Sequence, residues 1–253
     1  NTIELTEELN ITGKNLTING NDNKIDLKNS NNKIVVKSTA SGSTLSNINF
    51  ENYTSSAILL YNTKDITLDN IKLLGTDKKS SVGIDVSNST ATIKNITSKN
   101  HIECGIRLRD VSTVTFEGNN THENDTAAIR SMVKDGQDEN KIHDVNDQYL
   151  KTDEKVDSAN TKNEYYNTQK IVSVDTFEKL KDAITIPNSL IKITQDITLK
   201  ENLEIKANYV TIDGNNFKFD LGNVDSFSVK AKNVTLKNLE FANYKTTGLT
   251  LYG

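Results

Sequence analysis

The chain contains only three arginines, and their spacing suggests that they stack on one surface. Arg107 and Arg130 are 23 residues apart, and Arg109 lies two positions after Arg107. A guanidinium group binds a carboxylate through two parallel hydrogen bonds, so stacked arginines suit an acidic sugar such as a uronic or sialic acid. Tyr61, expected in the same column as Arg109, offers a ring that stacks on a sugar. These residues predict a face that binds an acidic glycan.

The same residues also permit a purely structural interpretation. Asp85 lies one repeat before Arg107 and is predicted to pair with it across neighbouring strands. Such a surface ion pair contributes roughly 0.2–1 kcal/mol and needs no ligand to explain it. A second column, formed by Asp69, Lys94 and Glu117, alternates in charge along the stack. We expect it to be structural, because alternating charges attract one another.

Two histidines lie close in the sequence to carboxylates, which is a composition found in metal sites. His101 and His122 are followed or preceded within a few residues by three acidic residues, Glu103, Glu123 and Asp125. Their places in the repeat differ by about one residue, which argues against a shared metal site. We therefore expect surface histidines in turns, and no metal is predicted.

No cofactor is predicted either. The segment 19–26 is rich in oxygen ligands for calcium but lacks the EF-hand spacing. The lone cysteine, Cys104, excludes an internal disulfide and is expected to be a small buried or turn residue.

A short repeat organises the elements that position these residues. The pattern Thr, apolar, any, Asn, apolar occurs at 44–48, 67–71 and 92–96, with a looser copy at 115–119. A second register of paired apolar residues keeps the same period, at 34/36, 58/60, 84/86 and 106/108. Alternating apolar and polar residues indicate strands with one buried face. Strands that recur every 22–26 residues without helices between them predict a parallel β-solenoid.

Two further features bear on this interpretation. The repeated asparagines, Asn47, Asn70 and Asn95, are predicted to form a ladder, because amides stacked about 4.8 Å apart hydrogen-bond along the column. Leucine-rich repeats share a similar period, and they are the alternative architecture. They require a dense leucine consensus, whereas this chain carries threonine and β-branched residues there.

A longer repeat indicates a second module. The segment 16–21 recurs at 210–215, and the segment 44–50 recurs at 235–241. We therefore predict a first β-helix module over 1–150, a polar linker over 151–172 and the start of a second module over 173–253. A helix is predicted over 175–184, with Asp175 as N-cap and Phe177, Leu180 and Ile184 on one face. This helix is expected to cap the second module, and we expect the cap of the first to precede residue 1 in a longer, multi-module chain.

Composition excludes two classes of partner. The 253 residues carry a net charge of -4, which gives no basic surface for nucleic acid. The longest apolar runs are far shorter than the roughly 20 residues that cross a bilayer.

The helix, the segment 190–199 and the segment 210–216 together resemble the opening of right-handed β-helices of the pectate lyase type. They are most similar to the pectate-lyase-like adhesive modules of Gram-positive bacterial cell-surface proteins. The resemblance implies an all-β, right-handed parallel β-helix and a secreted adhesin at the bacterial cell surface. Its partner would be a glycan or an extracellular protein on a host or another cell.

The catalytic motifs of enzymes with this fold are missing from the sequence. The Arg-x-Pro-x-x-Arg signature of pectate lyases cannot occur where Pro187 is the only proline, and the Asn-Thr-Asp and His-Gly segments of polygalacturonases do not occur. The chain also lacks the tryptophan found in the motif of pectin esterases. We therefore expect non-catalytic binding. The alternatives are a polysaccharide-active lyase or hydrolase, since one fold hosts many activities, and a structural stalk without a ligand.

Overall fold

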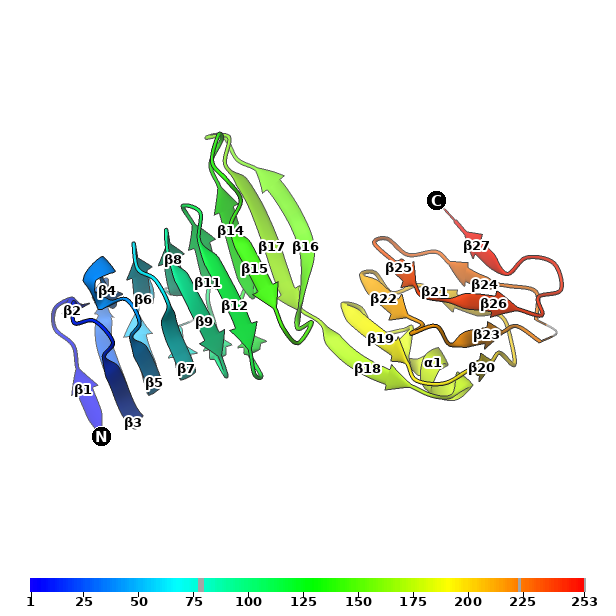
Figure 1. The fold of residues 1–253 in the computed structure, drawn as a ribbon, viewed down its shortest axis with the longest axis horizontal. Coiled ribbons are helices and arrows are strands. Elements are labelled where there is room, and N and C mark those ends of the chain that lie inside the picture. The colour runs from blue at the N-terminus through cyan, green and yellow to red at the C-terminus, as the bar shows by residue number, and fades with distance from the viewer. Residues whose placement is uncertain (77–79, 223, 253) are drawn as a thin grey trace. The chain divides into compact units, whose positions relative to one another are not determined.

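The computed structural model describes residues 1–76, 80–222 and 224–252. It is an all-β, right-handed β-solenoid of about 11 turns, which confirms the predicted fold class. The chain divides into two compact units, residues 1–168 and 169–253, which are coloured from blue to green and from green to red in Figure 1. Each unit is described by itself.

The first unit winds two parallel sheets around one core. The first sheet runs in the order β1 (Thr2–Glu4), β3 (Thr17–Ser30), β5 (Thr44–Tyr53), β7 (Ile66–Leu74), β9 (Thr90–Lys94), β12 (Thr113–Glu117) and β15 (Lys141–Asp144). It also includes β10 (Thr97–Lys99) and β13 (Thr121–Glu123). The parallel strands of the second sheet are β2 (Leu9–Ile11), β4 (Ile34–Val36), β6 (Ser56–Tyr61), β8 (Val82–Ser87), β11 (Cys104–Arg109) and β14 (Ile129–Val133). A short 3-10 helix, Ser38–Ala40, lies between β4 and β5.

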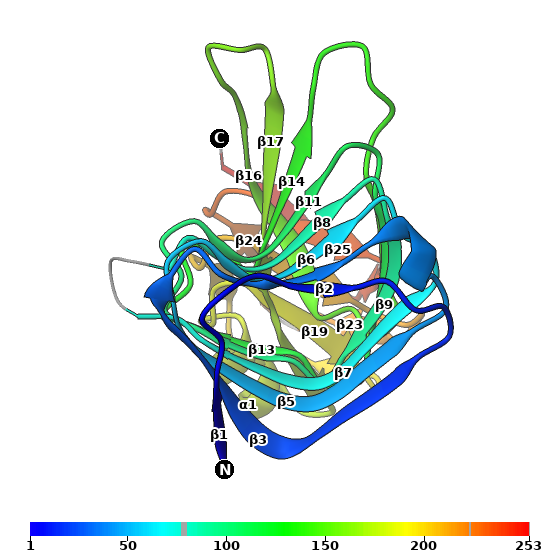
Figure 2. The same cartoon turned by 90° about the vertical axis from the view of Figure 1, so that its left-hand side faces the viewer.

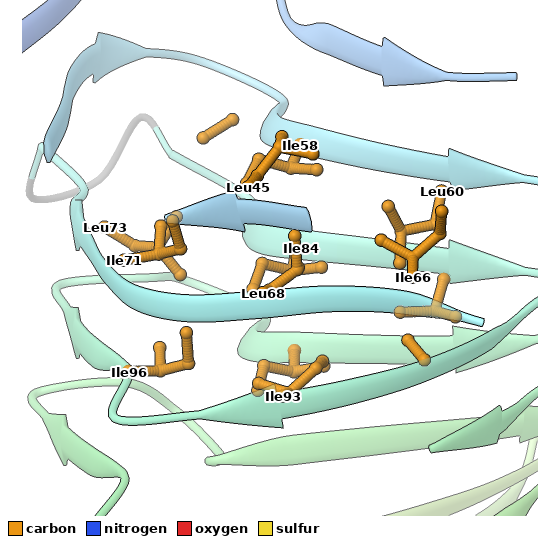
Figure 3. Packing of buried hydrophobic residues seen from close by; sticks show 14 of the residues in the cluster. Leu45, Ile58, Leu60, Ile66, Leu68, Ile71, Leu73, Ile84, Ile93 and Ile96 are labelled. Atoms are coloured by element: carbon orange, nitrogen blue, oxygen red, sulfur yellow. The ribbon is translucent and has the colours of Figure 1, made fainter. Parts of the chain in front are cut away.

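The core consists of stacked rows of apolar side chains, one from each coil. Leu45, Leu68, Ile93 and Phe116 are consecutive partners in the first sheet, and all four are fully buried. The second sheet contributes the row Ile34, Ile58, Ile84, Ile106 and Ile129. Figure 3 shows members of both rows facing one another. Both predicted registers therefore describe the interior of one solenoid, because inward positions alternate with outward ones along a strand.

The repeated asparagines adopt the left-handed backbone conformation, which asparagine tolerates better than most residues. Asn47, Asn70 and Asn95 have φ angles of 53°, 52° and 55°. Asn70 donates its side-chain amide to Asn47 at 2.7 Å, whereas Asn95 donates to Asp69 at 2.9 Å. The predicted amide ladder therefore holds between Asn47 and Asn70 but not between Asn70 and Asn95. The left-handed backbone conformation is a second reason for asparagine at this corner.

An antiparallel hairpin ends the second sheet of the first unit. Strand β17 (Lys162–Thr168) pairs antiparallel with β14, and β16 (Tyr149–Val156) pairs antiparallel with β17. Figure 2 shows this hairpin, and the loop after β14, reaching beyond the outline of the earlier coils. The segment 151–172, predicted to be a polar linker, is therefore mostly strand. Its polar composition reflects a hairpin with one exposed face.

The second unit is a three-sided coil. One sheet contains β18 (Lys170–Val174), β19 (Ser189–Ile193), β22 (Val210–Asp213) and β25 (Thr235–Lys237). The second contains β20 (Ile197–Thr198), β23 (Lys218–Asp220) and β26 (Glu240–Ala242). The third contains β21 (Leu203–Ile205), β24 (Phe227–Val229) and β27 (Leu249–Leu251).

Helix α1 (Phe177–Ala183) packs on the core of the second unit, as the sequence predicts. Phe177, Leu180 and Ile184 are all buried. The predicted N-cap is wrong by one residue: the hydroxyl oxygen of Thr176 accepts from the backbone N–H of Lys179 at 3.3 Å. Asp175 forms an ion pair with Lys179 instead, at 2.7 Å.

Equivalent residues of the two copies of the longer repeat differ in how deeply they are buried. Ile197 of β20 is 2% exposed, whereas Ile3, its equivalent in β1, is 58% exposed. Ile3 helps to line an apolar hollow of about 290 Å³ together with residues that include Ile11, Ile18 and Ile25. A cap for the first unit stays a prediction.

Candidate functional site

The arginines lie where the sequence places them, on the outward face of the second sheet. Arg107 of β11 is the register partner of Asp85 on one side and of Arg130 on the other. Arg109 lies in the neighbouring column, which passes through Ser87 to Tyr61. We call Arg107, Arg109, Arg130, Asp85 and Glu103 the arginine face.

Asp85 forms hydrogen bonds with two arginines of this face. Its buried carboxylate accepts from Nη2 of Arg107 at 2.7 Å and from Nε of Arg109 at 3.0 Å. Burial alone would raise the pKa of Asp85, but the hydrogen bonds and charges of the two arginines outweigh it and lower the pKa. Asp85 is therefore a fixed negative charge that orients two guanidinium groups, in agreement with the predicted ion pair.

Glu103 bridges the guanidinium groups of Arg107 and Arg130 at the surface. Its Oε2 accepts from Nη1 of Arg107 at 3.3 Å and from Nη1 of Arg130 at 2.9 Å, while Oε1 accepts from Ser81. Arg130 also donates twice to Oδ1 of Asn163, at 2.8 and 3.1 Å. An internal carboxylate thus occupies the position between the two arginines.

Aromatic rings flank the face on both sides. The guanidinium carbon of Arg130 lies 5.8 Å from the ring centre of Tyr165, and Tyr61 is exposed in the column of Arg109. The Arg130 geometry is that of a cation–π contact. Tyr61 is separated from Arg109 by Ser87, and its exposed ring is a surface on which a sugar can stack.

The edge of the face is a charged turn with an unusual backbone. Asp110 accepts from Arg109 at 2.9 Å and from Lys134 at 3.0 Å. Asp110 and Val111 both have positive φ angles, 56° and 62°, which is uncommon for a β-branched residue. A hollow of about 430 Å³ between the loop after β14 and the β16–β17 turn begins at Val133 and Lys134.

The column of Asp69, Lys94 and Glu117 lies on the first sheet, remote from the arginines along each coil. Lys94 pairs with Asp69 at 3.5 Å, and its register partner on the other side is Glu117. This geometry agrees with the structural role that the sequence indicates.

The expectation that the histidines lie on the surface is wrong. The side chains of His101 and His122 are 0% and 4% exposed, and both contact the carboxylate of Asp125, which is 1% exposed. The middle residue of β10, Ser98, pairs with Leu73 of β7 and with His122 of β13. The strand alternation thus directs His122 into the core, and this signal was present in the segments Thr-Ser-Lys and Thr-His-Glu.

Five side chains form a continuous path of hydrogen bonds inside the first unit, which we call the buried polar chain: Tyr53, His101, Asp125, His122 and Tyr149. The Tyr53 hydroxyl lies 2.6 Å from Nε2 of His101, and Nδ1 of His101 lies 2.7 Å from Asp125. Nδ1 of His122 lies 3.1 Å from Asp125, and Nε2 of His122 lies 3.1 Å from the hydroxyl of Tyr149. No sequence pattern indicates that the two tyrosines, 96 residues apart, belong to one network.

Asp125 uses its full capacity as an acceptor. Besides the two imidazoles, it accepts from the hydroxyl of Ser98 at 2.6 Å and from the backbone N–H of His101 at 3.0 Å. Burial acts to raise the pKa of Asp125, but the hydrogen bonds from His101 and His122 dominate and hold it well below its usual range. Burial likewise raises the pKa of Tyr53 and of Tyr149, so both phenols stay protonated.

The described residues, 1–76, 80–222 and 224–252, contain no metal-binding cluster and no membrane-spanning helix. No group of three or more His, Cys, Asp or Glu side chains in this part of the chain is arranged to hold a metal ion. None of the helices described is long and apolar enough to cross a membrane.

Two family models match the chain. The model of the right-handed β-helix region matches residues 1–146, and the model of a pectate lyase-like adhesive domain matches residues 171–253. No curated protein matches the chain. The first match covers most of the first structural unit, and the second match covers most of the second unit.

Proposed function

Because the chain belongs to the right-handed β-helix family and ends in a pectate lyase-like adhesive domain, we propose that it is an adhesin module. It acts at the outside of the bacterial cell and binds a ligand without chemical conversion. The ligand is a glycan that carries carboxylates, held on the arginine face. The adhesive domain model and the missing catalytic motifs both support binding over catalysis.

The observation that carries this proposal is the bridge made by Glu103 between Arg107 and Arg130. Each guanidinium group presents one Nη1 donor to the same carboxylate oxygen. A uronic or sialic acid has a carboxylate of the same chemistry, and it can replace Glu103 without rearranging the arginines. Tyr61 is exposed in the column of Arg109, two strands away with Ser87 between them, and provides a stacking surface for a further sugar of the same glycan.

We expect the double variant Arg107→Lys/Arg130→Lys to bind acidic glycans about thirtyfold more weakly, which is about 2 kcal/mol. Lysine keeps the charge beside Asp85 but loses the planar pair of donors. Surface plasmon resonance with oligogalacturonate and sialyllactose measures the change, with lactose as the neutral sugar.

The control for this variant is Lys72→Ala, which removes an exposed positive charge from β7 in the other sheet. It should leave affinity within about twofold, since a distant exposed charge is screened. Equal affinity of the wild-type protein and the double lysine variant would exclude the arginine face as the site.

Removal of the internal carboxylate should strengthen binding. We expect Glu103→Gln to bind oligogalacturonate about fivefold more tightly, because the ligand no longer competes with a charged acceptor for Arg107 and Arg130. The same titration checks this result at low and high salt. Unchanged or weaker binding by Glu103→Gln would contradict the view that Glu103 occupies the ligand position.

One observation favours a second function, a stalk that projects other domains. All three guanidinium groups have carboxylate partners within the protein, so the face is satisfied without a ligand. A stalk predicts that the wild-type protein binds none of the acidic glycans in the same titration.

A further inference from the structure

Arg107 and Arg130 are held with the same geometry by acceptors of different charge. Arg107 directs Nε and Nη2 at the carboxylate of Asp85, at 3.3 and 2.7 Å. Arg130 directs the same two nitrogens at Oδ1 of Asn163, at 3.1 and 2.8 Å. In both residues Nη1 remains for Glu103. A carboxylate thus orients Arg107 and balances part of its charge, whereas a neutral amide orients Arg130 and leaves its charge in place.

Asn163 is a fixed acceptor because its own amide is fully engaged. The residue lies on β17 and is only 2% exposed. Its Nδ2 donates to the backbone carbonyl of Thr161 at 2.9 Å and to the carboxylate of Asp157 at 3.3 Å. A reversed amide would place Nδ2 against the donors of Arg130, so these contacts set its orientation. Arg130 is therefore oriented before a ligand arrives, which reduces the entropy lost on binding.

The charges of the arginine face are unevenly balanced as a result. The other two arginines have Asp85 and Asp110 as partners. Asp110 also pairs with Lys134, whose side chain is 62% exposed and therefore screened by water. In the part of the chain that the structure describes, Arg130 forms an ion pair only with Glu103, which it shares with a neighbouring arginine. An anion therefore gains most at the Arg130 end of the face.

The carboxylate of Asp157, on the far side of the Asn163 amide, does not cancel this difference. The backbone N–H of Thr161 donates to Asp157 at 3.0 Å and is the main reason that the pKa of this carboxyl is lowered. Asp157 lies in the exposed turn between β16 and β17, where water screens its attraction for Arg130.

We propose that Asn163 is a positioning residue of the glycan site, which orients Arg130 without neutralising it, so that the ligand carboxylate binds at the Arg130 end of the arginine face. This inference rests on the proposed function, because it concerns how the same face binds an acidic glycan. It adds the β16–β17 hairpin to the site, since Asn163 and Tyr165 both belong to β17. The partly exposed ring of Tyr165, next to Arg130, offers an aromatic contact to the sugar that carries the carboxylate.

An exchange of amide and carboxylate tests the proposal at constant net charge. The double variant Asn163→Asp/Asp157→Asn places a carboxylate beside Arg130 and an amide in the exposed turn. At an ionic strength of ~0.01 M we expect about tenfold weaker binding of oligogalacturonate or sialyllactose, because Arg130 is then balanced by a second carboxylate. At ~1 M salt the difference from the wild-type protein should fall below about twofold, since screening removes it. Isothermal titration calorimetry of the full 253-residue chain measures both values.

The matched control is Asn160→Asp/Asp157→Asn, which makes the same exchange within the exposed turn. Its affinity should stay within about twofold of the wild-type value at both salt concentrations, because the new carboxylate remains in water. A tenfold loss in this control would overturn the proposal. So would an Asn163→Asp/Asp157→Asn variant that matches the wild-type protein, or one whose loss is equal at both salt concentrations, as expected of a hairpin that has merely detached.

NMR of the wild-type protein provides a test that does not require a stable variant. The chain has only three arginines, so three Nε–H signals report on the whole face. During titration with the acidic glycan we expect the largest shift at Arg130 and the smallest at Arg109. The reverse order would overturn the role of Asn163 and leave the arginine face as the site. If the wild-type protein binds neither acidic glycan, the proposed function is wrong and this inference is wrong with it.

Discussion

Replacing Asp125 with alanine should lower the free energy of unfolding of the first unit by about 3–5 kcal/mol, because several buried donors lose one shared acceptor. The substitution leaves four donors without their acceptor: both imidazoles, the hydroxyl of Ser98 and the backbone N–H of His101. None of these groups has ready access to water, because the side chains of Asp125 and the histidines are buried.

A urea titration read by hydrogen exchange measures this change, because peptides from each unit report its own transition. The matched control is Asp138→Ala in the exposed loop after β14, which should change stability by less than about 0.5 kcal/mol. A loss below about 1 kcal/mol in Asp125→Ala would show that the network contributes little.

The pH dependence of the free energy of unfolding provides a second measurement on the Asp125→Ala variant. The pKa of Asp125 is lowered in the folded state, so its stabilisation is present above about pH 4 and is lost as the pH falls further. Asp125→Ala should lose this component of the acid dependence, whereas Asp138→Ala should retain it.

Replacing Gly105 with alanine should destabilise the first unit by about 3 kcal/mol, because the new methyl group enters the same network. A Cβ atom at Gly105 would lie 2.5 Å from Nδ1 of His122, 2.6 Å from the hydroxyl of Ser98 and 2.7 Å from Oδ2 of Asp125. Ser98 and His122 both bond to Asp125 and lie on paired strands, so the three side chains cannot all move aside.

Gly136→Ala is the control for this substitution. A Cβ atom there meets nothing within 4 Å, but the φ of 74° costs about 1 kcal/mol for any residue with a side chain. Thermal unfolding followed by exchange of first-unit peptides separates the two effects. If Gly105→Ala costs no more than Gly136→Ala, the network has room for a methyl group.

The arginine face illustrates how structure and binding depend on the same residues. Asp85 holds Arg107 and Arg109 in fixed orientations, which reduces the entropy lost when a ligand binds. The same pairing lowers the electrostatic attraction between the face and an acidic glycan, because each guanidinium charge already has a partner. Affinity measurements on Glu103→Gln distinguish these two consequences.

Local pattern was sufficient to predict the solenoid. A strand buries every second side chain, so alternation within the repeat identified the core rows, and the period of 22–26 residues identified the stacking of one coil on the next. The arginine column followed from the same arithmetic, since Arg107 and Arg130 are separated by one coil. Helix α1 was predictable because its apolar residues follow helical spacing.

The boundaries and the interior polar groups were decided by tertiary structure. The hairpin of β16 and β17 looked like a linker because its exposed residues are polar, and its antiparallel pairing with β14 depends on a reversal of the chain that no repeat encodes. The N-cap is Thr176 and not the predicted Asp175, because the helix begins at Phe177 and the hydroxyl of Thr176 accepts from the backbone N–H of Lys179.

The sequence by itself therefore determined the period, the fold and the column in which the arginines lie, because these depend on which face each residue of a strand presents. Only the tertiary structure brought Tyr53, His101, Asp125, His122 and Tyr149 together. Their contacts span different coils, and the direction of a turn side chain depends on the coils stacked above and below it. The ring nitrogens of a histidine in a turn can form hydrogen bonds with water or with a buried carboxylate. The stacking of the coils places the carboxylate of Asp125 within reach here.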